Sequence, residues 1–214
     1  MLNIKFANGK QVSVEAGTTV YDAAAAAEAI SREVLAATVN GELVGLTTPL
    51  TADSEVKLHT FEDKEGKKVF RHTASHILAQ AVKRLYPEVK LTIGPAVDDG
   101  FYYDFDSDLP FDAAMLTAIE AEMKKIVKEN LKLERFTLPR DEAKKLMEEK
   151  GEPYKVELIN DLPEDAHISF YKQGEFTDLC AGPHLDSTGR VKGNAIKLLA
   201  CNAAYWRGDS SRQT

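Results

Sequence analysis

Two histidines, His72 and His76, lie within a stretch whose apolar residues recur at helical spacing. The apolar positions of this stretch are Ala74, Ile77, Leu78, Ala81, Val82 and Leu85. This spacing predicts an amphipathic helix, on which both histidines share a face about half a turn away from the apolar stripe. Both are therefore expected outside the hydrophobic core, as candidates for a functional site.

A second pair with the same three-residue gap, Cys180 and His184, follows about a hundred residues later. It encloses Gly182-Pro183, and because the residue before a proline disfavours helix, this piece is expected to be a turn. A helix would then present two imidazoles, and a loop would add a thiol and a third imidazole.

Three interpretations of these four side chains remain open. Three imidazoles and a thiolate suit a tetrahedral zinc ion, although a site with all four bound would be closed and hence structural. A metal-free cluster of histidine, cysteine, aspartate and lysine could instead activate water by general base action and hold an oxyanion. The third interpretation is incidental clustering. A nucleophilic Cys180 is disfavoured, because Gly-Pro follows it closely and not a helix N-terminus that would lower its pKa.

The charge balance is acidic, with 27 Lys and Arg against 34 Asp and Glu, so no overall basic field attracts nucleic acid. A polyanionic partner must be met locally. No apolar run reaches membrane length, and the N-terminus lacks the order of a signal peptide. The two cysteines are spaced unlike a disulfide framework. These features predict a cytoplasmic location and no membrane contact.

Residues 1–61 are expected to form a small ubiquitin-like sheet. Asn8-Gly9 and Asn40-Gly41 are strong hairpin signals between short alternating runs. Thr19 has the form of a helix cap before an alanine-rich run, and a strand at 56–58 completes the set. A charged linker is expected at 61–68. By itself such a module indicates a spacer or a partner-binding domain.

The remainder of the chain is expected to mix helices and strands, which makes the class α+β. Helical patterns cover residues 111–130 and 139–150. Strands are expected near 91–93, 101–105, 169–171, 176–180 and 195–199. Tyr154, Val156 and Leu158 alternate with polar or charged neighbours, which suggests a further strand with Lys155 as an ordinary exposed lysine. Cys201 is expected to be a small core residue.

Several longer pieces of the chain resemble bacterial threonyl-tRNA synthetase, collinearly through nearly the whole sequence. These pieces are residues 71–76, 93–104, 151–156, 178–184 and 204–209. The resemblance implies a β-grasp TGS domain at 1–61. It also implies a larger α+β editing domain at 62–205, with a mixed or antiparallel sheet and related to that of alanyl-tRNA synthetase. Residues 206–214 would begin a linker to a catalytic core.

The resemblance also implies an activity. A pocket built for threonine cannot strongly reject serine, because one methyl group is worth only about 1–3 kcal/mol of discrimination. A second site is then expected to hydrolyse the ester of seryl-tRNA(Thr), while a pocket too small for the extra methyl spares the correct product.

The implied catalytic residues are His72, His76, Lys155, Asp178, Cys180 and His184. In this hypothesis His72 and Lys155 position or deprotonate the attacking water, and Asp178 is the counter-charge of the serine amino group. Gly94, Tyr102 and Tyr103 are the implied substrate-binding residues, and either tyrosine could stack the terminal adenine. Editing is expected to need no cofactor. The alternative is a zinc ion held by His72, His76, Cys180 and His184, as the matching groups of the alanyl family hold it.

The family continues into a core with class II motifs and ATP and zinc sites, and these are not found before Thr214. The chain is therefore expected to be a fragment without aminoacylation, whose partner is the acceptor end of tRNA(Thr). The full-length parent is expected to be a homodimer through the missing core. Two other functions remain open: a non-catalytic RNA-binding module that uses Lys124, Lys125, Lys128 and Lys132, and a zinc-dependent hydrolase of another ester.

Overall fold

The computed structural model describes residues 1–214 and divides them into two compact units. The first unit is Met1–Thr73 with Gly182–Asp186, and the second is Ala74–Ala181 with Ser187–Thr214. Helices and strands mix in the chain, which confirms the α+β class. None of the helices combines the length and the apolar character that crossing a bilayer requires.

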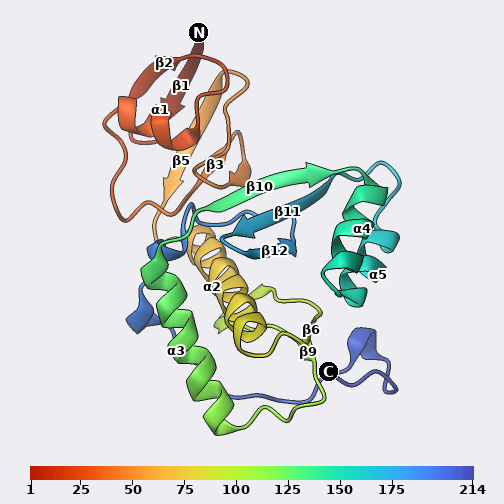
Figure 1. Ribbon diagram of the computed structural model, residues 1–214. Coiled ribbons are helices and arrows are strands. Elements are labelled where there is room, and N and C mark those ends of the chain that lie inside the picture. Colours follow the sequence, from red (N-terminus) through yellow and green to blue (C-terminus); the bar gives the residue numbers. More distant parts are fainter. The chain divides into compact units, whose positions relative to one another are not determined.

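The first unit is built on a five-stranded sheet with the order β2-β1-β5-β3-β4 (Figure 1). Its strands are β1 (Leu2–Phe6), β2 (Gln11–Val14), β3 (Ala36–Val39), β4 (Glu42–Val44) and β5 (Ser54–His59). The central pair β1 and β5 is parallel and the other pairs are antiparallel. With the helix α1 (Val20–Ala26), this is the ubiquitin-like β-grasp arrangement that the sequence predicts.

Local turn and cap chemistry explains this sheet. Asn40 and Gly41 both have positive φ, 48° and 86°, as the two-residue turn that matches strand twist requires. The Thr19 side chain accepts a hydrogen bond from the Asp22 N–H at 3.1 Å and so caps α1. The buried side chains of the sheet and α1, Ile4, Phe6, Val20, Ala24 and Val56 among them, form one apolar core.

The helix α2 (Lys64–Leu85) is longer and more deeply buried than the sequence predicts. It begins inside the stretch expected to be a linker, and every residue from Thr73 to Val82 is buried. A helix that is enclosed on all sides needs no single apolar stripe. The prediction that both histidines lie outside the core is therefore wrong for His76, which is only 3% exposed.

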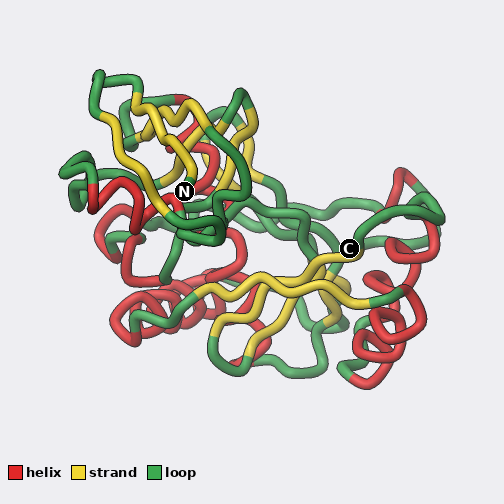
Figure 2. The backbone as a smooth tube through the Cα atoms, turned by 90° about the horizontal axis from the view of Figure 1, so that it is seen from above, coloured by secondary structure: helices red, strands yellow, loops and turns green.

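The second unit contains a three-stranded antiparallel sheet with the order β10-β11-β12. Its strands are β10 (Leu133–Leu138), β11 (Ile168–Gln173) and β12 (Phe176–Leu179). The helices α4 (Arg140–Glu149) and α5 (Pro153–Asp161) lie side by side at one end of this sheet (Figures 1 and 2). Their shared core consists of Ala143, Met147, Ile159, Ile168 and Phe170.

The rest of the second unit is one long helix, α3 (Ala113–Glu129), with short strands and turns. Two small ladders pair β6 (Lys90–Leu91) with β9 (Phe105–Asp106), and β7 (Ala96–Val97) with β8 (Gly100–Phe101). Three 3-10 turns lie at Thr188–Arg190, Gly193–Ala195 and Trp206–Gly208. The strand predicted at 195–199 does not form, and Cys201, predicted to be buried, is exposed.

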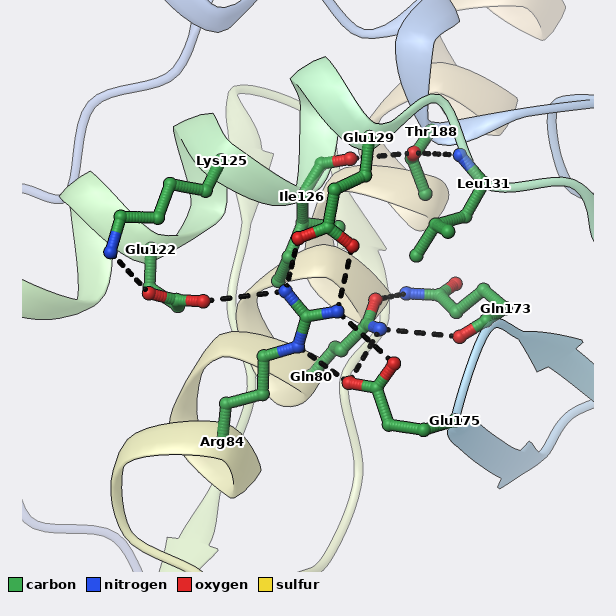
Figure 3. A network of polar contacts seen from close by, with 10 residues as sticks. All are labelled: Gln80, Arg84, Glu122, Lys125, Ile126, Glu129, Leu131, Gln173, Glu175 and Thr188. Carbon is green, nitrogen blue, oxygen red and sulfur yellow. Dashed lines mark hydrogen bonds and ion pairs between the residues drawn. The ribbon is translucent and has the colours of Figure 1, made fainter.

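A charged cluster ties three elements of the second unit together (Figure 3). Arg84 of α2 donates to both carboxylate oxygens of Glu129 on α3, at 2.7 and 2.8 Å. It also binds Glu175 in the β11–β12 turn, with Nε 2.5 Å from Oε1. Gln80 and Gln173 extend the cluster, and the Gln173 amide donates to the backbone carbonyl of His76 at 3.2 Å. The cluster therefore connects the β11–β12 turn to the helical turn that carries His76.

Candidate active site

Asp178 on β12 is the centre of a buried polar cluster in the second unit. It is 1% exposed, and three side chains contact its carboxylate. Lys155 Nζ lies 2.9 Å from Oδ1, the Tyr103 hydroxyl donates to Oδ2 at 2.7 Å, and His76 Nδ1 lies 3.5 Å from Oδ2. The structure thus brings together three predicted site residues, His76, Lys155 and Asp178, from a helix, a second helix and a strand.

The proton positions in this cluster follow from its donors and acceptors. Burial and the neighbouring Asp178 raise the pKa of Tyr103 well above its ordinary value, so the phenol keeps its proton and donates. An ionised carboxylate can only accept. Asp178 therefore favours the His76 tautomer with its proton on Nδ1, which leaves the ring lone pair on Nε2.

Lys155 corrects two predictions. The segment around it is the helix α5 and not a strand, because Pro153 begins the helix and a run of alternating residues this short fits either period. Lys155 is also not an exposed lysine, since it is only 3% exposed. Its ammonium also lies over the Tyr103 ring, 5.3 Å from the ring centroid.

Glu152 anchors the start of α5. This residue immediately precedes the helix and is 3% exposed. Its carboxylate accepts from the Leu91 N–H at 2.8 Å and lies 2.7 Å from Lys83 Nζ. The N-terminal turn that carries Lys155 is thereby fixed to α2 and to β6.

His72 and His184 form a second cluster, in the first unit. Their rings stack with centroids 4.2 Å apart and planes inclined by 28°. His72 Nδ1 lies 3.3 Å from the carbonyl oxygen of Pro183. Because a carbonyl can only accept, Nδ1 carries the proton and the lone pair of neutral His72 is on Nε2.

Thr73 contacts the ring nitrogen Nδ1 of His184. Its Oγ1 accepts from the Leu185 N–H at 3.0 Å and lies 3.0 Å from His184 Nδ1. The hydroxyl can donate to Nδ1, which places the ring proton of neutral His184 on Nε2, or its second lone pair can accept from Nδ1–H. His184 is 2% exposed, so its ring nitrogens depend on protein partners for hydrogen bonds.

The chemistry of the donors allows a test of the zinc hypothesis. Zinc is the metal that three imidazoles and a thiolate suit best. His72 and His184 belong to the first unit, and His76 and Cys180 belong to the second. With the proton on Nε2 and Nδ1 accepting from Thr73, neither nitrogen of neutral His184 offers a lone pair to a metal, whereas with the proton on Nδ1 its Nε2 does. The contact with Thr73 fits either form, and zinc binding by the four side chains stays a prediction.

The remaining predicted residues lie as follows. Cys180 follows β12 directly and is half-buried, and its backbone exchanges hydrogen bonds with Ser169 at 3.0 and 2.7 Å. Gly94 packs so closely on Tyr103 that an added Cβ would lie 2.1 Å from that ring. Tyr103 also stacks on Phe105, with centroids 5.0 Å apart, so its ring is already covered. Tyr102 is 41% exposed.

Sequence reasoning missed two residues that shape these clusters, Thr73 and Glu152. It named Tyr103 but missed the role of its hydroxyl. The sequence offered a clue to Thr73, since this residue lies inside the His72–His76 motif and a buried hydroxyl needs hydrogen-bond partners. It offered no clue to Glu152 or to the Tyr103 hydroxyl, because their partners lie far away in the sequence.

Comparison with known proteins gives two family matches. Residues 3–60 match the TGS domain family, and residues 168–214 match the family described as the threonyl and alanyl tRNA synthetase second additional domain. The threonine–tRNA ligases of Clostridium kluyveri and Clostridium tetani are 59% and 58% identical to the chain over all of its 214 residues. That of Clostridium botulinum is 59% identical over the same length. The chain spans 33% of the length of each of these relatives.

Proposed function

From this similarity to one third of the threonine–tRNA ligases, we propose that the chain carries an editing deacylase that hydrolyses the ester of seryl-tRNA(Thr). The match to the second additional domain supports this proposal, because its residues 168–214 include Asp178, Cys180 and His184. The acceptor end of tRNA(Thr) is the proposed partner. Dimerisation of the longer relatives and the domain boundaries at 61 and 205 are proposals of the same kind.

The observation that carries the proposal is the enclosed Lys155–Asp178 pair with its tyrosine donor. Both side chains of the pair are at most 4% exposed. Burying two charges is costly, and a buried ion pair adds little net stability compared with apolar side chains. Lysine and aspartate are rarely buried this completely, so the pair marks a candidate functional site.

The reaction needs a base, a donor for the developing oxyanion and a group that recognises the amino acid. Water attacks the ester carbonyl carbon, and the bond between that carbon and the ribose oxygen breaks. The ribose oxygen takes up a proton, which gives free serine and a tRNA with a free hydroxyl group. A cation beside the carbonyl oxygen stabilises the negative charge that develops there.

We assign these tasks by chemistry. His72 Nε2 has the lone pair to accept the proton of the water, because Nδ1–H is held by Pro183. Lys155 supplies a fixed cation near the ester, and Asp178 holds Lys155 and counters the charge of the serine amino group. His76, Cys180 and His184 are the other proposed catalytic residues. No metal is needed for any of these tasks.

The substrate contacts are proposed from packing. The close approach of Gly94 to Tyr103 leaves no room for a side chain there, which suits a pocket that excludes the methyl group of threonine. Tyr102 has the exposed ring that stacking on the terminal adenine would need, whereas both the ring and the hydroxyl of Tyr103 are already engaged.

The test is the rate at which the chain releases serine from seryl-tRNA(Thr) and threonine from threonyl-tRNA(Thr), with and without a chelator. We expect loss of serine alone, unchanged by the chelator. The variants His72→Ala and Lys155→Ala should each lower the rate by about a hundredfold or more. His167→Ala and Lys145→Ala are matched controls, since both residues are exposed.

Three results would count against the proposal. Full activity of His72→Ala would remove the base assignment. Loss of activity on chelation would return the zinc hypothesis. No hydrolysis of either ester, with tRNA still bound, would leave a non-catalytic recognition module.

A further inference from the structure

The last residues of the chain fold back into a small hairpin within the second unit. Ala204 and Thr214 exchange two backbone hydrogen bonds of 2.8 Å, and Tyr205 pairs with Gln213 in an antiparallel bridge. Between them the Trp206 side chain is 4% exposed. We call residues 204–214 the clasp, because its side chains pack on helix α5.

The clasp contacts Tyr154 and Glu157 of α5 through two side chains. The Trp206 ring meets the Tyr154 ring edge to face, with centroids 4.9 Å apart, and its Nε1 donates to Glu157 Oε2 at 3.1 Å. Arg212 binds both Glu157 oxygens, at 2.6 and 3.1 Å, and lies 5.0 Å from the centroid of Tyr154. The Arg212 guanidinium beside it lowers the pKa of Glu157, so this carboxylate stays charged at neutral pH.

A third contact lies one helical turn further on, where Arg207 binds Asp161. Positions 154, 157 and 161 follow the i, i+3, i+7 spacing of one helix face. The clasp therefore contacts one face of α5 along the whole length of the helix.

Lys155 is the neighbour of this face and points to the other side of the helix, where it meets Asp178. The helix that carries it has nine residues. Helices this short are marginal on their own, so their position depends on tertiary contacts. Glu152 fixes one end of α5 to Leu91 and Lys83, and the clasp supplies contacts along the outer face.

We propose that the clasp positions Lys155, by holding the outer face of α5 so that the ammonium stays against Asp178. Tyr154, Glu157, Trp206 and Arg212 are then positioning residues, which act through Lys155 and touch no substrate. The inference rests on the proposed deacylase function for its kinetic readout only. It ties the reactivity of a buried side chain to the last eleven residues of this chain.

The test uses the complete chain and measures Lys155 directly. The double variant Trp206→Leu/Arg212→Gln opens the clasp. Limited acetylation with acetic anhydride, followed by mass spectrometry, compares labelling of Lys155 with that of Lys145, which is 75% exposed. We expect labelling of Lys155 to rise by about tenfold relative to Lys145, because local opening limits access to a buried amine.

Deacylation of seryl-tRNA(Thr) is the second readout. A displaced Lys155 should lower kcat by about tenfold with KM nearly unchanged, since small misplacements of a catalytic group act on the chemical step. Arg212→Lys keeps the cation but loses the bidentate contact with Glu157, so both readouts should lie between those of the wild type and the double variant. Glu149→Gln, which breaks an exposed ion pair on α4, is the matched control and should change neither.

The outcomes separate the two proposals. Wild-type labelling of Lys155 in the folded double variant would overturn the positioning role, whatever happens to kcat. If the double variant does not fold, labelling of Lys155 in the single variant Arg212→Gln decides the positioning role by the same criterion. If the wild-type chain hydrolyses no seryl-tRNA, the proposed function fails, and the labelling result still decides whether the clasp holds Lys155.

Discussion

Lys155 Nζ lies 2.9 Å from Asp178 Oδ1, and the two side chains are 4% and 1% exposed. Because both charges are out of water, each depends on the other for compensation. Breaking such a pair from one side leaves an unpaired buried charge, which costs far more than the net contribution of the pair. Substituting one member of the pair should therefore lower the free energy of unfolding more than the pairing alone contributes, and substituting both should recover part of that loss.

Asp178→Asn should lower the free energy of unfolding by about 3 kcal/mol, because it leaves the Lys155 ammonium buried without a countercharge. Adding Lys155→Met to the same chain should recover part of this loss, with a coupling energy of about 1 kcal/mol or more. Urea unfolding of the wild type, the two single variants and the double variant measures both values. Lys145→Met, in an exposed pair with Glu149, is the control and should change stability by less than about 1 kcal/mol. Strict additivity of the two buried substitutions would contradict the pairing.

Gly94→Ala should disturb the Asp178 cluster from outside it. The added Cβ would lie 2.1 Å from the Tyr103 ring, so the ring must move and its hydroxyl must leave Asp178. Overpacking of this kind costs about 1–3 kcal/mol, which thermal unfolding can measure. Gly100→Ala is the matched control, because nothing lies within 4 Å of its added Cβ. Equal melting temperatures for the two variants would refute the close packing.

The parts of the fold that follow local rules could be predicted from the sequence. The Asn40-Gly41 turn and the Thr19 cap depend on residues within four positions of each other, and both form. Helices α3 and α4 have long periodic patterns and also form as predicted. The histidine and cysteine motifs were visible for the same reason, since each lies within five residues.

The parts that depend on distant partners could not be predicted. Lys155 is buried because Asp178, 23 positions later, compensates its charge, and no local pattern shows this. The alternation of Tyr154, Val156 and Leu158 predicts a strand, although the same residues form part of a short helix packed on both sides. Cys201 illustrates the opposite error, because a residue type that is usually buried lies exposed in an irregular segment.

Glu175→Gln should weaken the Arg84 cluster in a pH-dependent manner (Figure 3). Hydrogen bonds from Arg84 lower the pKa of Glu175 to about 2 from 4.5. A folded-state pKa below the unfolded value means that the stabilisation is complete above pH 4.5 and is lost as the pH falls to about 2. Because the Glu175 side chain is half exposed, we expect a loss of only about 1 kcal/mol at pH 7. Urea unfolding at pH 7 and pH 2 tests this, and a difference that persists at pH 2 would contradict the ion pair.

Thr73→Val should change the protonation of one histidine and leave its stacked neighbour as it is. In the wild type the Thr73 hydroxyl lies 3.0 Å from His184 Nδ1, and we expect it to donate there, while Pro183 accepts from His72 Nδ1. The two neutral rings should therefore show opposite tautomers in ¹⁵N NMR spectra, with the proton on Nε2 of His184 and on Nδ1 of His72. The variant removes the donor to His184 and the acceptor of the Leu185 N–H, so it should release the His184 tautomer and cost about 1–3 kcal/mol of stability.

The control for this substitution is Thr137→Val, on an exposed position of β10, which should change neither the spectra nor the stability by a comparable amount. The outcome also bears on the zinc hypothesis. A wild-type His184 with its proton on Nδ1 would mean that the Thr73 hydroxyl only accepts there, and the lone pair would be on Nε2. His184 would then have the lone pair that a zinc ligand needs.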